Sequence, residues 1–287
     1  MRFSLSTGSL YLYPLRHTFA LAKELGFEGL EVALSLEVLV RRAGYVRRLS
    51  LEYGLPVFSL HPPMIPWPKL REHHKLLPQL TSVARDLGCH FIVIHAPKAL
   101  TLTEGVGAEY AGAVRACVED LRGSSLRLCV ENQAVFRPSD RRYVLSAPGS
   151  LRQFAEEYDL SVTLDTAHAA SFPYDLIEAY ETWESRLVNI HLSDFRQNLS
   201  IPPWFNLHSY FKHHQVPGDA DLPLVPLLER LKADSYEGLI TVEVSPFALE
   251  AWRPQRVREN LKRCLDFVQR PCSPFGSVED RKRARMA

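Results

Sequence analysis

Short runs rich in β-branched residues alternate with longer stretches of helical periodicity along most of this chain, and this rhythm limits the folds that are open to it. The expected strands are Arg2–Ser6, Gly29–Val32, Val57–Leu60, Phe91–Ile94, Leu126–Val130, Ser161–Leu164, Val188–Ile190 and Leu239–Val242. Several are continuous apolar runs, which is typical of parallel strands covered on both faces. Eight strand–helix units favour an α/β fold with a single (β/α)8 TIM barrel. A doubly wound open sheet is the alternative, because periodicity does not reveal closure.

The length and composition of the chain fit one such barrel. The sequence has 287 residues, of which 46% are hydrophobic and 23% charged, as in ordinary globular proteins. A (β/α)8 barrel takes about 250 residues, so we assign residues 1–271 to the barrel. Residues 272–287 end in RKRARMA and have no apolar period, which predicts a flexible basic tail.

The overall charge and the cysteines indicate where such a protein works. The net charge is +1, so it gives no sign of a nucleic-acid partner. The five cysteines form no CxxC pair, which is typical of reduced thiols. The N-terminus has no signal-peptide pattern, and no apolar run approaches the roughly 18 residues of a membrane helix. We therefore expect a cytoplasmic protein without membrane contact.

Side chains that can bind a metal ion stand at the ends of seven of the expected strands. They are Glu31, His61, His95, Glu131, Asp165 with His168, His191 with Asp194, and Glu243. The carboxyl ends of parallel barrel strands share one face, where the active sites of this architecture lie. A buried carboxylate without a partner costs several kcal/mol or takes up a proton. A divalent cation neutralises carboxylates and accepts imidazole lone pairs, so the pattern predicts a metal centre.

The motifs around these residues resemble those of one superfamily. HPP, IHAP, VEN, LDTAHAA, IHLSD, HxxPGDAD and VEVSP occur in this order. Together they are similar to the divalent-metal-dependent TIM barrels of the xylose isomerase-like group, over about residues 1–269. That group includes the tagatose 3-epimerases, inosose dehydratase and endonuclease IV of the AP endonuclease family 2.

The resemblance to the epimerase-like members implies a site for one metal ion. Its ligands are the positions that match Glu131, Asp165, His191 and Glu243. In those enzymes the two glutamates also form the acid–base pair that moves a proton at the carbon next to a carbonyl group. His168 then binds a substrate hydroxyl group.

The resemblance to endonuclease IV implies a larger site. One zinc ion there would be held by Glu131 with His61 and His95, and a second by the four-ligand set. A third uses two histidines, matched by His168 and His214, and an aspartate that is Lys212 in this chain. A protonated lysine does not ligate a metal ion, which puts a complete three-zinc centre in doubt.

These residues predict a metal-dependent isomerase or epimerase that acts on a sugar, polyol or related hydroxy-carbonyl molecule through an enediolate. The expected cofactor is one to two divalent ions per chain, of zinc, manganese or magnesium. We group His168, His214, Lys212 and Asp194 as substrate-binding residues, with Asp194 holding an imidazole or a loop amide in place.

Two other activities stay open. One is an endonuclease IV-like zinc phosphoesterase, favoured by His61, His95 and the basic run Arg137, Arg141 and Arg142. The other is a dehydratase of the inosose type. A small molecule is the favoured partner, nucleic acid is the less favoured one, and assembly into a homo-oligomer stays open.

Overall fold

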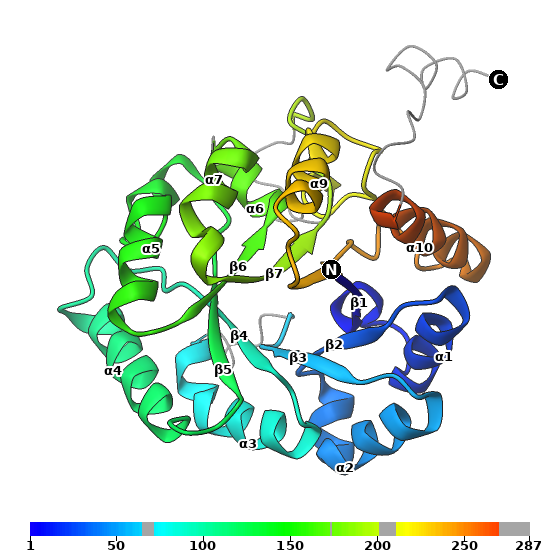
Figure 1. Cartoon of the computed structure of the whole chain (residues 1–287), viewed down its shortest axis with the longest axis horizontal. Coiled ribbons are helices and arrows are strands. Elements are labelled where there is room, and N and C mark those ends of the chain that lie inside the picture. Colours follow the sequence, from blue (N-terminus) through cyan, green and yellow to red (C-terminus); the bar gives the residue numbers. More distant parts are fainter. Residues whose placement is uncertain (65–71, 173, 201–210, 270–287) are drawn as a thin grey trace.

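Eight parallel strands form a closed barrel in a computed structural model that describes residues 1–64, 72–172, 174–200 and 211–269. The strands are β1 (Arg2–Ser6), β2 (Gly29–Ala33), β3 (Val57–His61), β4 (Phe91–His95), β5 (Arg127–Glu131), β6 (Ser161–Asp165), β7 (Leu187–Leu192) and β8 (Leu239–Val242). Each strand pairs with its neighbour in sequence, and β8 pairs with β1 (Figure 1). The predicted TIM barrel is confirmed, and the open sheet is excluded.

Most strands extend slightly further than the sequence predicted. His61, His95, Glu131 and Asp165 are the last residues of their strands instead of the first residues of the following loops. The strand register explains this, because His95 pairs with Glu131 and Asp165 pairs with His191. The backbone ladder therefore fixes these side chains more firmly than loops would.

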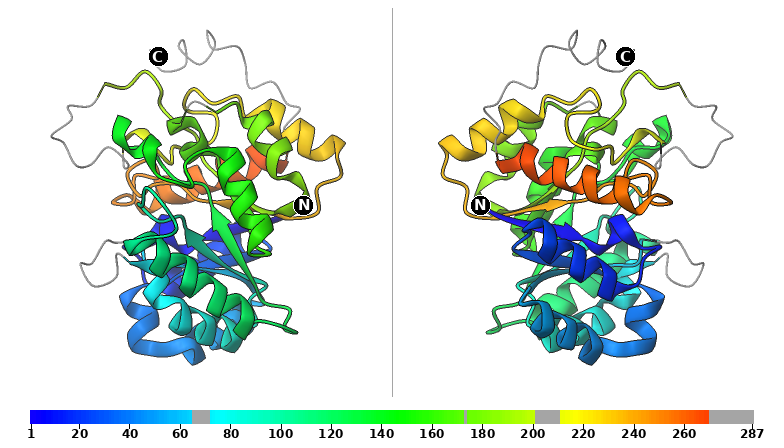
Figure 2. Two further views of the ribbon diagram at one scale, coloured as in Figure 1. Left: turned by 90° about the vertical axis from the view of Figure 1, so that its left-hand side faces the viewer. Right: turned by 90° about the vertical axis from the view of Figure 1, so that its right-hand side faces the viewer.

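Helices surround the strands and cover their outer face (Figures 1 and 2). The α-helices are α1 (Leu15–Leu25), α2 (Leu36–Tyr53), α3 (Leu77–Leu87), α4 (Gly105–Asp120), α5 (Pro148–Glu157), α6 (Thr166–Ser171), α7 (Leu176–Trp183), α9 (Leu224–Ala233) and α10 (Pro254–Gln269). Short 3-10 helices are η1 (Thr7–Leu10), η3 (His73–Leu76), η4 (Pro138–Arg142) and η5 (Glu184–Arg186). Gly26 and Gly88 end α1 and α3 in the left-handed conformation, with φ of 92° and 69°. Both helices therefore end at a glycine.

The two faces of the barrel wall differ in polarity. Between strands and helices lies the apolar core, with Leu5, Leu60 and Leu164 fully buried. Inside the barrel, polar side chains bond to one another, as Thr241 does with Ser4 at 2.8 Å and with Asn189 at 2.9 Å. The ligand residues therefore stand above a polar layer and not above a fully apolar one.

Some predictions fall on residues outside the described part of the chain. One of them is the flexible basic tail at 272–287. Within the described residues, no helix is both long enough and apolar enough to cross a membrane.

Candidate metal centre

All six predicted metal ligands converge at the carboxyl ends of the strands. Three groups of side chains, in each of which the ligand atoms lie within 4.8 Å of one another, are found among the described residues. They are Glu131, Asp165, His191 and Glu243; His61, His95 and Glu131; and Asp165, His168 and His214. Glu131 and Asp165 are shared, so the groups form one continuous cluster.

His191 is held so that one ring nitrogen faces the carboxylates of the four-ligand group. Its Nε2 lies 3.0 Å from Glu31 Oε2, which also accepts a hydrogen bond from Ser59 at 2.9 Å. Glu31 Oε2 accepts the hydrogen bond of Ser59, so the proton of its contact with His191 is assigned to Nε2. His191 Nδ1 then lies 2.8 Å from Glu243 Oε2 and 3.4 Å from Glu131 Oε1. This carboxylate–imidazole pair is the support that metal-binding histidines usually have.

Asp165 is oriented by its own backbone and by Asn132. It ends β6 and caps α6, because its Oδ1 accepts the N–H of His168 at 2.7 Å. The Asn132 amide bonds to both the N–H and the C=O of Asp165, at 2.7 and 3.0 Å. These bonds leave Asp165 Oδ2 directed to the ligand group. Asp165 thus has two roles, because one oxygen caps α6 at His168 and the other faces the ligand group.

Unpartnered buried atoms test whether this cluster fits a cation. Glu131 Oε2, Asp165 Oδ2 and His191 Nδ1 are buried and make no hydrogen bond of good geometry among the described residues, although His191 Nδ1 lies close to Glu243 and Glu131 Oε2 lies close to His95. A buried polar atom left without a partner costs about 1–3 kcal/mol. Coordination to one divalent ion would satisfy all three, so the residues fit the metal ion that the sequence predicted.

The charges within the metal-free cluster shift one another's pKa values. Burial works against the charged form of His191, but Glu31, Glu243 and Glu131 outweigh it and raise its pKa well above the usual range. Burial likewise opposes ionisation of Glu131 and Glu243, yet His191 lowers the pKa of both. Burial raises the pKa of Asp165. In the metal-free cluster the carboxylates thus favour the protonated form of His191, and a metal ion would supply the positive charge in its place.

His61 and His95 present two nitrogens to Glu131. His61 Nδ1 lies 2.8 Å from the carbonyl oxygen of Pro62, which only accepts, so His61 Nε2 is free to ligate. That Nε2 lies 3.0 Å from His95 Nε2, and the two lie 3.6 and 3.1 Å from Glu131 Oε2. His95 remains 35% exposed, so this group lies closer to solvent.

His168 and His214 lie on the other side of the cluster. His168 Nδ1 donates to the carbonyl of Asn132 at 3.0 Å and lies 3.1 Å from Glu131 Oε1. Burial lowers the pKa of His168, but Asp165 and Glu131 outweigh it and raise it to about 9. His214 Nδ1 lies 3.8 Å from Asp165 Oδ2. Both imidazoles are therefore placed to meet a bound substrate or a further ion.

Lys212 and Asp194 are engaged in other contacts. The Lys212 ammonium lies over the Phe195 ring, 5.4 Å from its centroid. The Asp194 carboxylate accepts backbone N–H bonds from Phe195, Gly218, Ala220 and Leu222. Both oxygens of Asp194 are used by this loop, so its geometry matches the expected hold on loop amides and not direct substrate binding.

Two polar residues of the site were not predicted as part of it. His73 lies in η3 with its ring 4.9 Å from that of His95, and burial followed by His95 lowers its pKa to about 2. Asn132 orients Asp165, as described above. The VEN motif contained Asn132, but the sequence around His73 (REHHKLL) carries no comparable signal.

Comparison with known proteins gives a consistent family. The family model described as a xylose isomerase-like TIM barrel matches residues 19–269. An uncharacterised protein of Mycobacterium leprae is 26% identical over 274 residues, which cover 85% of this chain and 89% of that protein. An uncharacterised protein of Mycobacterium tuberculosis is also 26% identical, over 272 residues, with the same coverage.

Solved structures share the fold at low identity. A D-psicose 3-epimerase from Clostridium cellulolyticum has a TM-score of 0.68 at 17% identity, covering 94% of this chain and 98% of that one. A 3-keto-D-glucoside 4-epimerase from E. coli has a TM-score of 0.67 at 18% identity, with 92% and 99% covered. An AP endonuclease of family 2 from Brucella melitensis has a TM-score of 0.65 at 17% identity, with 88% and 97% covered.

Proposed function

The chain belongs to the xylose isomerase-like TIM barrel family, and on this premise we propose that it is a divalent-metal-dependent isomerase or epimerase. Its substrate is a sugar, polyol or related hydroxy-carbonyl molecule. The observation that carries the proposal is the buried four-ligand group, which holds two glutamates, Glu131 and Glu243, beside one imidazole. Two of the structural neighbours are named as epimerases that act on sugars, which supports the same class of substrate.

The metal ion would be held by Glu131, Asp165, His191 and Glu243. When bound, it supplies positive charge that stabilises negative charge on the substrate oxygens. One glutamate accepts the proton from the carbon next to the carbonyl group, and a proton that comes from solvent through the other glutamate is delivered to the opposite face. His168 and His214 lie at the edge of the group, where their ring nitrogens can bind substrate hydroxyl groups.

Deuterium incorporation from D2O tests this proposal directly. Proton transfer through an enediolate replaces the hydrogen next to the carbonyl group by solvent deuterium, which ¹H NMR detects even when no net product forms. The protein is loaded with Mn²⁺, Zn²⁺ or Mg²⁺ and incubated with ketohexoses, polyol-derived ketones and hydroxy keto acids. Exchange with at least one of these is expected.

Glu243→Gln is the critical variant in this assay. It removes an acid–base group that contributes about 10²–10⁴-fold in rate, together with one charge of the ligand group, so exchange should fall at least about 1,000-fold. Glu237→Gln carries the same change six residues earlier at an exposed position and should leave exchange intact. Undiminished exchange in Glu243→Gln would refute the site assignment.

A metal-dependent phosphoesterase is the second candidate, and a specific observation favours it. Two further groups of side chains offer positions for ions beside the four-ligand group. One is His61, His95 and Glu131, and the other is Asp165, His168 and His214. Neighbouring metal ions activate water and clamp a phosphate. Elemental analysis of protein purified without chelator separates the two candidates: two or three zinc ions per chain, with cleavage of DNA containing an abasic site, would replace the epimerase proposal.

A further inference from the structure

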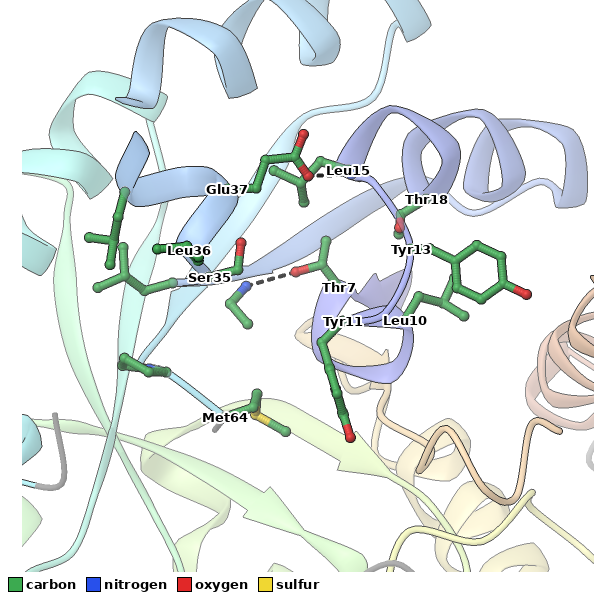
Figure 3. Close-up of a pocket in the computed structure, with 14 residues that line it drawn as sticks. Thr7, Leu10, Tyr11, Tyr13, Leu15, Thr18, Ser35, Leu36, Glu37 and Met64 are labelled. Atoms are coloured by element: carbon green, nitrogen blue, oxygen red, sulfur yellow. Dashed lines mark hydrogen bonds between the residues drawn. The ribbon is translucent and has the colours of Figure 1, made fainter. Parts of the chain in front are cut away.

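A cavity of about 290 Å³ lies over the carboxyl ends of β1, β2 and β3 (Figure 3). It lies between η1, the first turns of α1 and α2, and Met64 after β3. Its wall includes Leu10, Leu34 and Leu36. We call this cavity the β1–β3 pocket.

The β1–β3 pocket adjoins the ligand group. Ala33 lines the pocket, lies two residues after Glu31 and pairs with His61. Pro63 lines it two residues after His61. Because an extended residue spans at most about 3.6 Å, these Cα atoms lie within about 7 Å of those of Glu31 and His61. The pocket and the metal centre therefore lie at the same end of the barrel, on neighbouring stretches of backbone.

The polar side chains of the pocket are mostly engaged by the backbone. Thr7 accepts the N–H of Ala33 at 2.8 Å, and Glu37 accepts that of Leu15 at 2.9 Å. Tyr13 donates to the carbonyl of Ala251 at 2.7 Å, and Ser35 accepts the N–H of Val38 at 3.3 Å. The Thr18 oxygen is itself buried, so it offers no accessible group to an occupant. The pocket thus offers mainly apolar walls.

This lining does not suit a fully hydroxylated carbon chain. Each hydroxyl group that leaves water needs a hydrogen-bond partner, and a predominantly apolar wall does not provide one for each. Ligand pockets of about 300 Å³ and above are typically lined by apolar groups with a few placed polar ones. Because most polar groups of this pocket already bond to the backbone, its occupant should be apolar.

We propose that the substrate carries an apolar substituent, an aryl ring or a short alkyl chain, away from its reacting hydroxy-carbonyl group, and that the β1–β3 pocket binds this substituent. The assignment rests on the proposed function, because the metal centre fixes which end of the substrate reacts. It excludes a free hexose as the preferred substrate.

Binding to the pocket is measurable without turnover. Met64 lines the pocket, whereas Met1 lies at the exposed N-terminus, so methyl-¹³C methionine labelling places a reporter inside the pocket with an internal control. Titration with benzyl alcohol should shift the Met64 methyl resonance, assigned with Met64→Leu, and leave that of Met1 in place. Glycerol at the same concentrations should shift neither.

Two matched variants locate the binding. Leu36 lines the pocket and is 62% exposed, and Leu51 lies on the same helix and is 75% exposed. Because both leucines are exposed, a variant with a polar residue at either position should still fold. Leu36→Asn should weaken benzyl alcohol binding about tenfold, the lower range for loss of an apolar contact, and Leu51→Asn should leave it unchanged. Equal weakening in both variants would overturn the pocket assignment.

The substrate part is then tested by deuterium exchange. A hydroxy ketone with a phenyl or alkyl substituent should have a KM at least about tenfold below that of the unsubstituted compound, and Leu36→Asn should reduce this ratio. An unshifted Met64 resonance overturns the proposal whatever the enzyme does. A shifted resonance without exchange of any hydroxy-carbonyl compound overturns the proposed function and the substrate assignment with it. Equal KM values for the two compounds overturn the substrate assignment alone.

Discussion

The two halves of the barrel mouth differ in the polarity of their side chains. Over β3 to β8 the strands end in buried carboxylates and imidazoles, several of which lack hydrogen-bond partners among the described residues. Over β1 and β2 the strands end in Ser6 and Ala33, and the mainly apolar β1–β3 pocket lies above them and reaches the residues that follow β3. The first half presents ligands that fit a cation, and the second presents a mainly apolar wall. In the two proposals above, reaction chemistry and substrate selection belong to separate strands of one sheet.

The contrast is sharpest at Glu31. It belongs to β2, on the pocket side, yet its carboxylate crosses the barrel to His191 on β7. It therefore joins the two halves through its contact with His191 and through the hydrogen bond that it accepts from Ser59 on β3. Removing its charge is the most direct way to test whether the ligand half depends on support from β2.

Glu31→Gln should weaken metal binding about 10–100-fold, the range found when partners of metal-ligating histidines are removed. The amide keeps the shape but no longer fixes the protonated Nε2 of His191 with a charge. Isothermal titration with Mn²⁺ or Zn²⁺ measures the change. Glu28→Gln, at an exposed carboxylate three residues earlier, is the control, and equal affinities in both variants would contradict the supporting role of Glu31.

Metal affinity should rise with pH, by up to about tenfold per unit. The raised pKa of His191 means that the metal-free site holds a proton below that pKa, and a metal ion must displace it. As pH falls, the proton competes more strongly, so binding weakens. Titrations between pH 6 and 9 in buffers of different ionisation enthalpy should report proton release on binding. Binding without proton release would show that His191 is already neutral.

The smallest expected effect lies in the pocket half. Thr18→Val keeps the side-chain shape and removes a buried hydroxyl that has no partner among the described residues. The free energy of unfolding should therefore rise by about 1 kcal/mol, the lower range for an unsatisfied buried group. Urea denaturation measures it. Metal affinity should not change, and if it did, the two halves would not be independent.

The sequence predicted the ligand half better than the pocket half, for a physical reason. Buried carboxylates such as Glu131 and Glu243 conflict with their apolar neighbours, and this conflict is visible in a string of residues. Leu10, Leu34 and Leu36 look like any other core residues, and only their positions in space reveal that a cavity lies between them.

The sequence did not predict the contacts across the barrel either. The partner of Glu31 belongs to a strand that is not its neighbour in the sheet, so strand order alone did not predict the pair. The charge of Lys212 was visible in the sequence, whereas its position over Phe195 depends on the path of the loop. The strands and their order, in contrast, followed from periodicity and were confirmed nearly to the residue.

Closure of the sheet between β1 and β8 also has a consequence during synthesis. The ligand group takes members from β5, β6, β7 and the end of β8, so a ribosome must pass residue 243 before the last ligand exists. β1 can pair with β8 only after β8 has been made, so closure joins the most distant parts of the barrel sequence. Contacts between distant parts of a chain form slowly, so closure is a slow event in folding. A nascent chain therefore cannot capture a metal ion in the complete site early. Metal bound at that site afterwards stabilises only the finished barrel, since a ligand favours the state that binds it.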